Sequence, residues 1–174
     1  MRSRLPRPSA TQDVHGFTLV ELMTVLTVMA VLLAVAVPAF DGVRLSTRLN
    51  AYANSLVAAS QLARSEAIKR NATVTLCASA DGSTCATNGH WEAGWVVRTD
   101  TTLIRAQPAA ADGYLLRDAG NLSSLSYEAT GLGVNQSTIT ICRATPSAGS
   151  QERVVKISAT GRTSITSTTS GACS

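Results

Sequence analysis

The side chain with the most unusual chemistry in this sequence is the carboxylate of Glu21, because it lies in a long run of apolar residues. The run extends from Phe17 to Phe40, and its sixteen residues from Leu22 to Val37 carry no charge. A carboxylate inside a lipid bilayer costs about 2.5–3.5 kcal/mol on insertion scales. We therefore expect Glu21 to have a function and a partner that makes its burial less costly.

Two simpler interpretations of this segment stay open. In the first, Glu21 lies close enough to the membrane interface to reach water. In the second, the run is a secretory signal peptide that is cleaved at Ala34-Val35-Ala36, which would release a soluble domain. The acid within the run, the long polar leader before it and the helical pattern that continues beyond Ala36 argue against the second interpretation.

Basic residues in front of the apolar run predict how the chain is oriented in a membrane. Residues 1–16 contain Arg2, Arg4 and Arg7. Positive charges mark the cytoplasmic flank of a membrane segment, so we expect everything after the run to lie outside the cytoplasm. Residues 17–40 are just long enough for a transmembrane helix, which needs about 20 residues.

All four cysteines follow the apolar run. An even number of cysteines outside the cytoplasm indicates two disulfides, and four cysteines allow three pairings. We favour Cys77 with Cys85, which flank a turn-rich segment, and Cys142 with Cys173, which would tie the C-terminal tail to a strand. The rival is a metal site, but the spacings contain no C-x₂-C pair, and His90 is the only histidine after the run. We therefore expect no metal and no cofactor.

Positive charge is concentrated near the C-terminus. Residues 129–174 carry four bases against one acid, a net charge of +3. A basic surface binds phosphate groups without sequence preference. The candidate DNA-binding residues are Arg143, Arg153, Lys156 and Arg162.

The sequence contains no motif of an enzyme. G-x-S-x-G, a Walker loop, H-E-x-x-H and G-x-G-x-x-G are all absent from it. His90, next to Trp91 in an expected loop, is more simply a surface residue than a catalytic base. We therefore expect no catalytic residues and no enzymatic activity.

Length and composition agree with one domain and an appendage. The chain has 174 residues, a formal net charge of +4, 45% hydrophobic residues and 15% charged residues. These values exclude a multidomain enzyme and a disordered chain.

The remaining elements must position these residues. Residues 41–71 predict an amphipathic helix that continues the apolar segment, because apolar or small residues recur every three or four positions. This stripe consists of Leu45, Leu49, Tyr52, Leu56, Ser60, Ala63 and Ala67.

The pattern changes over residues 72–174 to short strands separated by turns that contain glycine and asparagine. The expected strands are Thr73–Ser79, Trp95–Thr99, Leu125–Glu128, Thr138–Arg143, Arg153–Ser158 and Thr163–Thr166. The fold class is therefore α+β, with one long helix whose distal half packs on a small antiparallel β-sheet head.

The N-terminal residues Gly16-Phe17-Thr18-Leu19-Val20-Glu21 resemble the prepilin processing site of type IV pilins and type II secretion pseudopilins. The resemblance implies the pilin fold, cleavage of the leader 1–16 between Gly16 and Phe17, and N-methylation of Phe17 by the prepilin peptidase. The segments Ser60–Cys77 and Trp91–Val97 are similar to the subfamily that contains minor pseudopilin H and the minor pilins FimT and FimU.

Cleavage would give Glu21 a charged partner. The new amine at Phe17 is poorly placed for the Glu21 of its own helix, whereas a neighbouring subunit that is shifted along the axis brings its amine to this carboxylate. Two charges that are each costly in lipid become less costly together. We expect this pair to set the register of subunits during assembly.

The resemblance implies a minor type IV pilin, a structural subunit that assembles or primes a pilus tip. Its partners would be other pilins or pseudopilins, the prepilin peptidase, the assembly platform of the inner membrane and the lipid bilayer. It would cross the inner membrane once, with its head in the periplasm, and then join the pilus or pseudopilus tip.

Two alternatives are a minor pseudopilin H of type II secretion and a minor pilin that binds DNA for uptake. FimT-type minor pilins linked to DNA uptake carry a Gly-Arg-x-Arg motif near the C-terminus. The matching residues here are Gly161-Arg162-Thr163-Ser164, in which serine replaces the second arginine. The missing charge weakens the DNA interpretation.

Overall fold

The computed structural model describes residues 16–145, 148–171 and 173. Residues 1–15, which contain most of the expected leader, lie outside these ranges. The chain forms two compact units, Met1–Asp41 and Gly42–Ser174.

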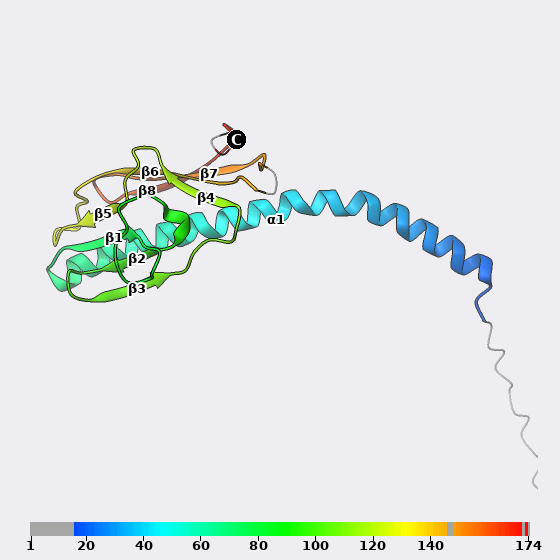
Figure 1. Ribbon diagram of the computed structural model, residues 1–174, viewed down its shortest axis with the longest axis horizontal. Helices are drawn as coiled ribbons and strands as arrows, with labels where there is room; N and C mark the ends of the chain where they lie inside the picture. Colours follow the sequence, from blue (N-terminus) through cyan, green and yellow to red (C-terminus); the bar gives the residue numbers. More distant parts are fainter. Residues whose placement is uncertain (1–15, 146–147, 172, 174) are drawn as a thin grey trace, which may run out of the picture. The chain divides into compact units, whose positions relative to one another are not determined.

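A single helix, α1 (Leu19–Arg70), occupies most of the first half of the chain (Figure 1). Its 52 residues include the parts expected as a membrane helix and as an amphipathic helix. The helix ends at Asn71, whose positive φ of 50° places it in the left-handed region. The amides of Asn71 and Ala72 donate to the carbonyls of Ile68 and Ala67, which satisfies the last turn in the manner of a Schellman motif.

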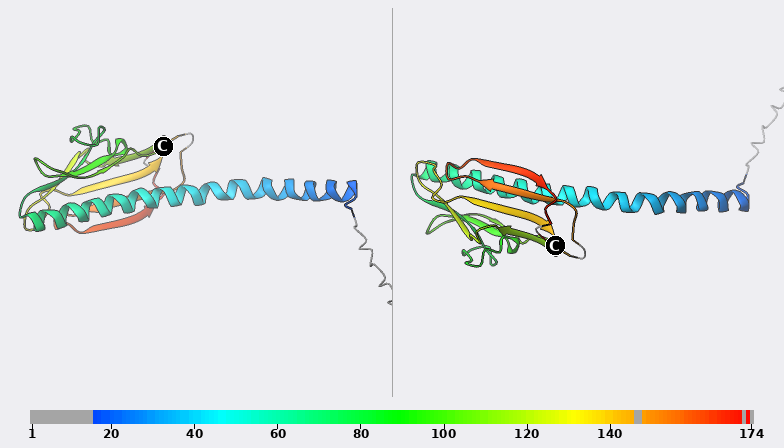
Figure 2. Two further views of the ribbon diagram at one scale, coloured as in Figure 1. Left: turned by 90° about the horizontal axis from the view of Figure 1, so that it is seen from below. Right: turned by 90° about the horizontal axis from the view of Figure 1, so that it is seen from above.

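Two four-stranded antiparallel sheets follow the helix. The first sheet has the order β3-β2-β1-β5 and the second the order β4-β6-β7-β8. Their bounds are β1 (Val74–Ala78), β2 (Trp95–Arg98), β3 (Leu103–Gln107), β4 (Tyr114–Asp118), β5 (Ser124–Tyr127), β6 (Ser137–Arg143), β7 (Glu152–Ile157) and β8 (Thr163–Thr168), with a short 3₁₀ helix η1 (Trp91–Ala93) before β2. Strands β6, β7 and β8 lie side by side along the distal part of α1 (Figure 2).

One hydrophobic core joins α1 to both sheets. The helix contributes large side chains such as Leu49 and Leu56, together with small ones such as Ala63, all of which are fully buried. The first sheet contributes Leu76 and the second Ile141, both with no exposed surface. Small residues on the helix stripe allow the strands to approach it closely, as close packing of an interior requires.

The expected stripe of α1 is confirmed: all of its members are buried except Tyr52, which is half-buried. The α+β fold class is also confirmed. The head differs from the expectation in having two sheets, because β3 and β4 were not expected as strands. Their sequences, LIRAQ and YLLRD, each begin with adjacent apolar residues and continue with charged or polar ones, so they lack the apolar alternation that predicts a strand.

Candidate assembly site and head surface

Thr18 caps the beginning of α1. The amide of Glu21 donates to the Thr18 hydroxyl at 3.2 Å, and the amide of Leu22 donates to the Thr18 carbonyl at 3.1 Å. Thr18 and Glu21 have the Thr-x-x-Glu spacing of a capping box, a pattern that the sequence analysis did not use. Glu21 therefore has a local structural role, since an acid in the first turn also suits the helix dipole.

The carboxylate of Glu21 has no hydrogen bond or ion pair within the described residues, and its side chain is exposed. The capping contact uses its backbone amide alone. Within the part of the chain that the structure describes, the acid is thus unpaired at the beginning of the helix, and Phe17, four residues earlier in the sequence, is 84% exposed.

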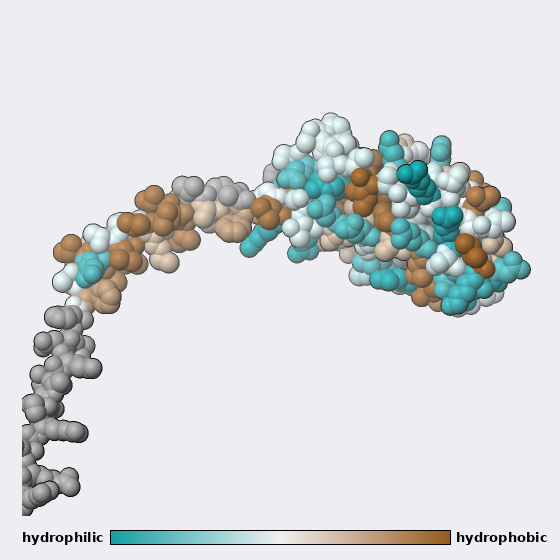
Figure 3. Space-filling model, turned by 180° about the vertical axis from the view of Figure 1, so that it is seen from behind, coloured by the Kyte–Doolittle hydropathy of each residue, from teal (hydrophilic) through white to brown (hydrophobic). Residues whose placement is uncertain are grey.

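Large apolar side chains are exposed over the part of α1 that belongs to the first unit. They are hydrophobic residues from Leu19 to Leu33, each more than half exposed. Figure 3 shows this hydrophobic surface in brown. An apolar surface of this extent marks contact with a membrane or with other proteins.

Among the described residues, no helix combines the length and hydropathy needed to span a membrane.

Two disulfides hold the head, Cys77–Cys85 and Cys142–Cys173, as the sequence analysis favoured. The first closes the segment after β1. The second joins β6 to the C-terminal tail, which is also held by Glu152, because the buried Glu152 carboxylate accepts hydrogen bonds from Thr168 and Ser170.

Asp81 organises the segment inside the first disulfide. One carboxylate oxygen accepts the amides of Ser83 and Thr84 at 2.9 and 2.8 Å, and the other accepts the Thr84 hydroxyl at 2.6 Å. These bonds, led by that of the Thr84 hydroxyl, hold the pKa of the Asp81 carboxyl well below its usual range. The acid is a turn former, as we expect for aspartate in a loop.

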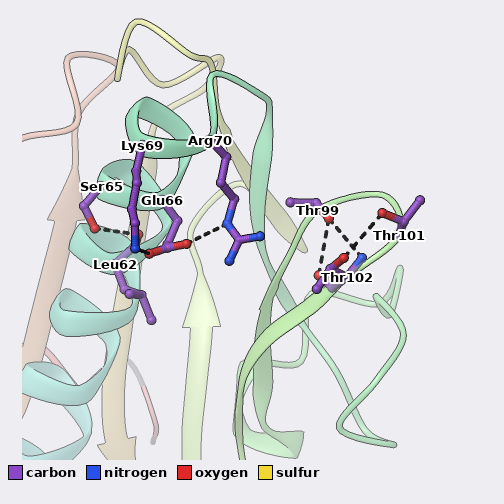
Figure 4. A network of polar contacts seen from close by, with 8 residues as sticks. All are labelled: Leu62, Ser65, Glu66, Lys69, Arg70, Thr99, Thr101 and Thr102. Atoms are coloured by element: carbon purple, nitrogen blue, oxygen red, sulfur yellow. Dashed lines mark hydrogen bonds and ion pairs between the residues drawn. The ribbon is translucent and has the colours of Figure 1, made fainter.

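A second carboxylate at the end of α1, that of Glu66, is held by two basic side chains (Figure 4). Glu66 accepts from the Nε of Arg70 at 2.6 Å and lies 3.6 Å from the Nζ of Lys69. The Arg70 hydrogen bond holds the pKa of the Glu66 carboxyl below its usual value.

In the turn between β2 and β3, the hydroxyl of Thr99 accepts the amide of Thr102 at 2.9 Å.

His90 and the two tryptophans have structural roles. Nδ1 of His90 lies 3.1 Å from Glu92, which also pairs with Arg117 at 2.8 Å. Trp91 and Trp95 are buried in the core, and the Trp91 indole donates to a backbone carbonyl at 2.8 Å.

The four candidate DNA-binding residues do not form one surface. Arg153 is only 7% exposed and donates to Asn50 and Ser46 of α1 at 2.6 and 3.0 Å, so it joins β7 to the helix. Arg143 is half-buried at the end of β6 and makes contacts within the chain.

The other two candidates, Lys156 and Arg162, are exposed and line one groove of about 740 Å³ on the second sheet. Burial removes Arg153 from any such surface. DNA binding stays a prediction that concerns Lys156 and Arg162 alone.

The sequence matches models of two known protein features, which identify the family of the chain. The family model described as Type II transport protein GspH matches residues 52–161, which is more than half of the chain. The chain belongs to the GspH family. The prokaryotic N-terminal methylation motif matches residues 12–37, which include Gly16, Phe17 and Glu21. GspH-family proteins are pilins or pseudopilins, a structural rather than an enzymatic class.

Solved structures agree with this GspH-family fold. Two crystal forms of the type IV minor pilin FimU from Pseudomonas aeruginosa are similar to the chain. The P21 form has 20% identity and a TM-score of 0.57, with 74% of this chain and 97% of that chain covered. The P65 form has 21% identity and a TM-score of 0.54, with 72% and 100% covered. The similarity shows the α+β pilin fold. No curated protein sequence matches the chain.

Proposed function

We propose that this GspH-family chain is a minor type IV pilin that is cleaved after Gly16, N-methylated at Phe17 and assembled at a pilus tip. The observation that carries the proposal is the exposed carboxylate of Glu21, which has no partner among the described residues and lies at the beginning of a helix with an exposed apolar surface. The matching methylation motif supports it, because that motif directs the processing that creates a charged amine at Phe17.

The same features explain how the subunit would assemble. Phe17 precedes α1, which begins at Leu19, so the helix does not hold the Phe17 amine against the Glu21 carboxylate of the same chain. A neighbouring subunit that is shifted along the axis brings its amine against this acid, and the exposed apolar side chains of both helices pack together. Before assembly, the inner membrane would cover these side chains, with the head in the periplasm.

The two disulfides support a head in the periplasm. Disulfides form and persist in oxidising compartments such as the periplasm, and both of them lie in the second unit. The partners of the chain would be other pilins of the filament, the prepilin peptidase and the assembly platform.

The experiment is to express Glu21→Ala and Glu21→Gln in the native organism and to measure the chain in sheared filaments relative to the membrane fraction. We expect at least a tenfold loss for both variants, since each removes the charge that pairs with the amine. Glu128→Ala, which removes an exposed acid of the head, is the matched control. Incorporation of Glu21→Ala at the wild-type level would overturn the proposed register.

A minor pseudopilin H of type II secretion is the second candidate, and the description of the matching family favours it. Deleting the gene separates the two functions. A minor pilin predicts loss of surface pili with unchanged protein secretion, whereas a pseudopilin predicts loss of secretion with unchanged pili.

A further inference from the structure

Strand β8 is an edge that the protein leaves open. Among the residues that the structure describes, it pairs only with β7, and it ends the order of the second sheet (red in Figure 2). Its six residues, Thr163–Thr168, contain only threonine, serine and isoleucine, and its pairing with β7 has no bulge. Natural edge strands usually carry charges, proline or bulges that prevent another strand from pairing with them. None of these is present within β8.

A groove lies at the beginning of this strand. Its volume is about 640 Å³, and it runs between the distal part of α1 and the turn that leads into β8. The helix contributes Arg64 and Ile68, and the turn contributes Arg162 and Thr163. Ile68 is 52% exposed, so the groove offers an apolar contact next to two cations.

Arg64 has an unsatisfied donor at this groove. Its Nε is buried and has no hydrogen-bond partner among the described residues. Its side chain lies against Gly131 and Gly161, which have positive φ values of 78° and 74°. A Cβ at Gly161 would lie 3.0 Å from Cδ of Arg64, so this glycine leaves the space that the arginine fills. Buried donors in proteins are nearly always paired, so this Nε is an exception. Because Nε has no exposed surface, a partner from outside the chain would meet Arg64 only through the part of its side chain that lines the groove.

The two charged residues that line the groove, Arg64 and Arg162, are both positive. The described residues that line it include no acid. Arg162 also lines the adjoining groove with Lys156, where the one acid is Asp118. Both oxygens of Asp118 are already occupied, by the Ser137 hydroxyl and by the amides of Gly120, Leu122 and Thr138. Asp118 keeps its negative charge, but the three bases that line the two grooves, Arg64, Lys156 and Arg162, outnumber this one acid among the described residues. Arginine pairs well with carboxylates.

We propose that the β8 edge and its groove dock an extended, acidic segment of a neighbouring filament subunit, an inference that rests on the proposed function. The backbone of the incoming segment would pair with β8, and its acidic side chains would reach Arg64 and Arg162. Only a polypeptide strand can pair in register with the free amides and carbonyls of an edge strand. This feature favours a peptide over a nucleic acid, which would use the cations and leave the edge unpaired.

Binding of short peptides to the full-length chain in detergent micelles tests the docking site directly. The probe is a capped peptide of alternating threonine and glutamate, about six residues long to match a strand. A peptide with glutamine in place of glutamate tests the charge, and a glutamate peptide with N-methylated alternate amides tests the strand pairing. We expect the glutamate peptide to bind at least tenfold more tightly than either of the others.

Variants of the chain test which arginines bind the glutamate peptide. We expect Arg64→Gln and Arg162→Gln each to weaken the glutamate peptide about tenfold, as the loss of a charge-assisted hydrogen bond predicts. Arg105→Gln, which removes an exposed arginine from edge strand β3, is the matched control and should bind like the wild type. Arg162 is exposed, so its variant tests the site even if Arg64→Gln does not fold.

Three results would overturn the proposal. The first is equal binding of the glutamate peptide by Arg162→Gln and the wild type. The second is equal binding of the N-methylated peptide. The third is tighter binding of oligothymidine than of the glutamate peptide, with the same dependence on both arginines, which would assign the site to nucleic acid.

Recovery of the chain from sheared filaments separates this proposal from the proposed function. If the wild-type chain is in filaments and does not bind the glutamate peptide, docking at β8 is wrong and the filament function stands. If the chain is absent from filaments, the filament function fails and so does a filament subunit as the occupant, whatever the peptide does.

Discussion

In the core, the hydroxyl of Ser60 on α1 and the hydroxyl of Tyr127 on β5 form a hydrogen bond of 2.5 Å. Both residues are about 1% exposed. Burial raises the pKa of the Tyr127 phenol, so the bond joins two neutral groups at neutral pH. Because neither hydroxyl reaches water, each depends on the other for a partner.

Removing one of these hydroxyls has a measurable cost. We expect Tyr127→Phe to lower the free energy of unfolding by about 1–3 kcal/mol, because it leaves the Ser60 hydroxyl buried without a partner. Adding Ser60→Ala to Tyr127→Phe should recover part of the loss. Denaturant unfolding in detergent measures both, with Tyr114→Phe, a half-buried tyrosine, as the control. Equal stability of Tyr127→Phe and the wild type would contradict this assignment.

The lowered pKa of Asp81 predicts how the first disulfide segment responds to acid. A carboxyl whose folded pKa lies below its unfolded value of about 3.9 adds stability that is complete above pH 3.9 and is lost as the pH falls toward the folded pKa. We therefore expect the amide chemical shifts of Ser83 and Thr84 to stay constant from pH 7 to pH 4. The shifts should change only in stronger acid. A midpoint near pH 4, or identical behaviour of Asp81→Asn, would refute the role of the carboxylate.

Residue roles were partly readable from the sequence. The turn-forming aspartates and the cysteine pairs follow from residue type and spacing. Arg153 was expected at the surface and is buried, because neighbouring residues of a strand face opposite sides and the sequence does not say which side meets the helix. Arg64 carries no sequence signal, since its place depends on turns at Gly131 and Gly161, which are distant in the chain.

At the scale of elements, α1 determines how closely the sheets can pack. Alanines at positions 53, 59, 63 and 67 of α1 are buried against the sheets. The larger buried side chains of the helix, Leu45, Leu49 and Leu56, lie mostly earlier in the sequence. The helix, its end at Asn71 and six of the strands follow from the periodicity of the sequence. Edge strand β3 does not, because its side chains are mostly exposed and its stability comes from pairing with β2.

A matched pair of helix substitutions tests this packing. Ala63 has no exposed surface, so Ala63→Leu should lower the free energy of unfolding by about 1–3 kcal/mol through overpacking. Ala58→Leu adds the same side chain at an exposed position of the same helix and should be nearly neutral. Thermal unfolding of both variants measures the difference. Similar midpoints for the two would show that α1 does not pack on the sheets as described.

In the whole molecule, the net charge of +4 is the sum of segments whose charges have different roles. Three arginines lie in the expected leader and would leave with it. Within the described residues, the carboxylate of Glu21 is unpaired at the beginning of the helix, and the bases beside β8 outnumber the one acid that lines the same grooves. The family could be predicted from the N-terminal motif, which is short and local. The surfaces that select partners could not, because they are assembled from distant turns and strands.

We propose above all that this GspH-family chain is a processed filament subunit. Mass spectrometry of the N-terminal peptide of the chain recovered from sheared filaments tests it most directly. We expect a chain that begins at Phe17 and carries one N-terminal methyl group. Absence of the chain from filaments, a retained leader, or an N-terminus that follows Ala36 would contradict it.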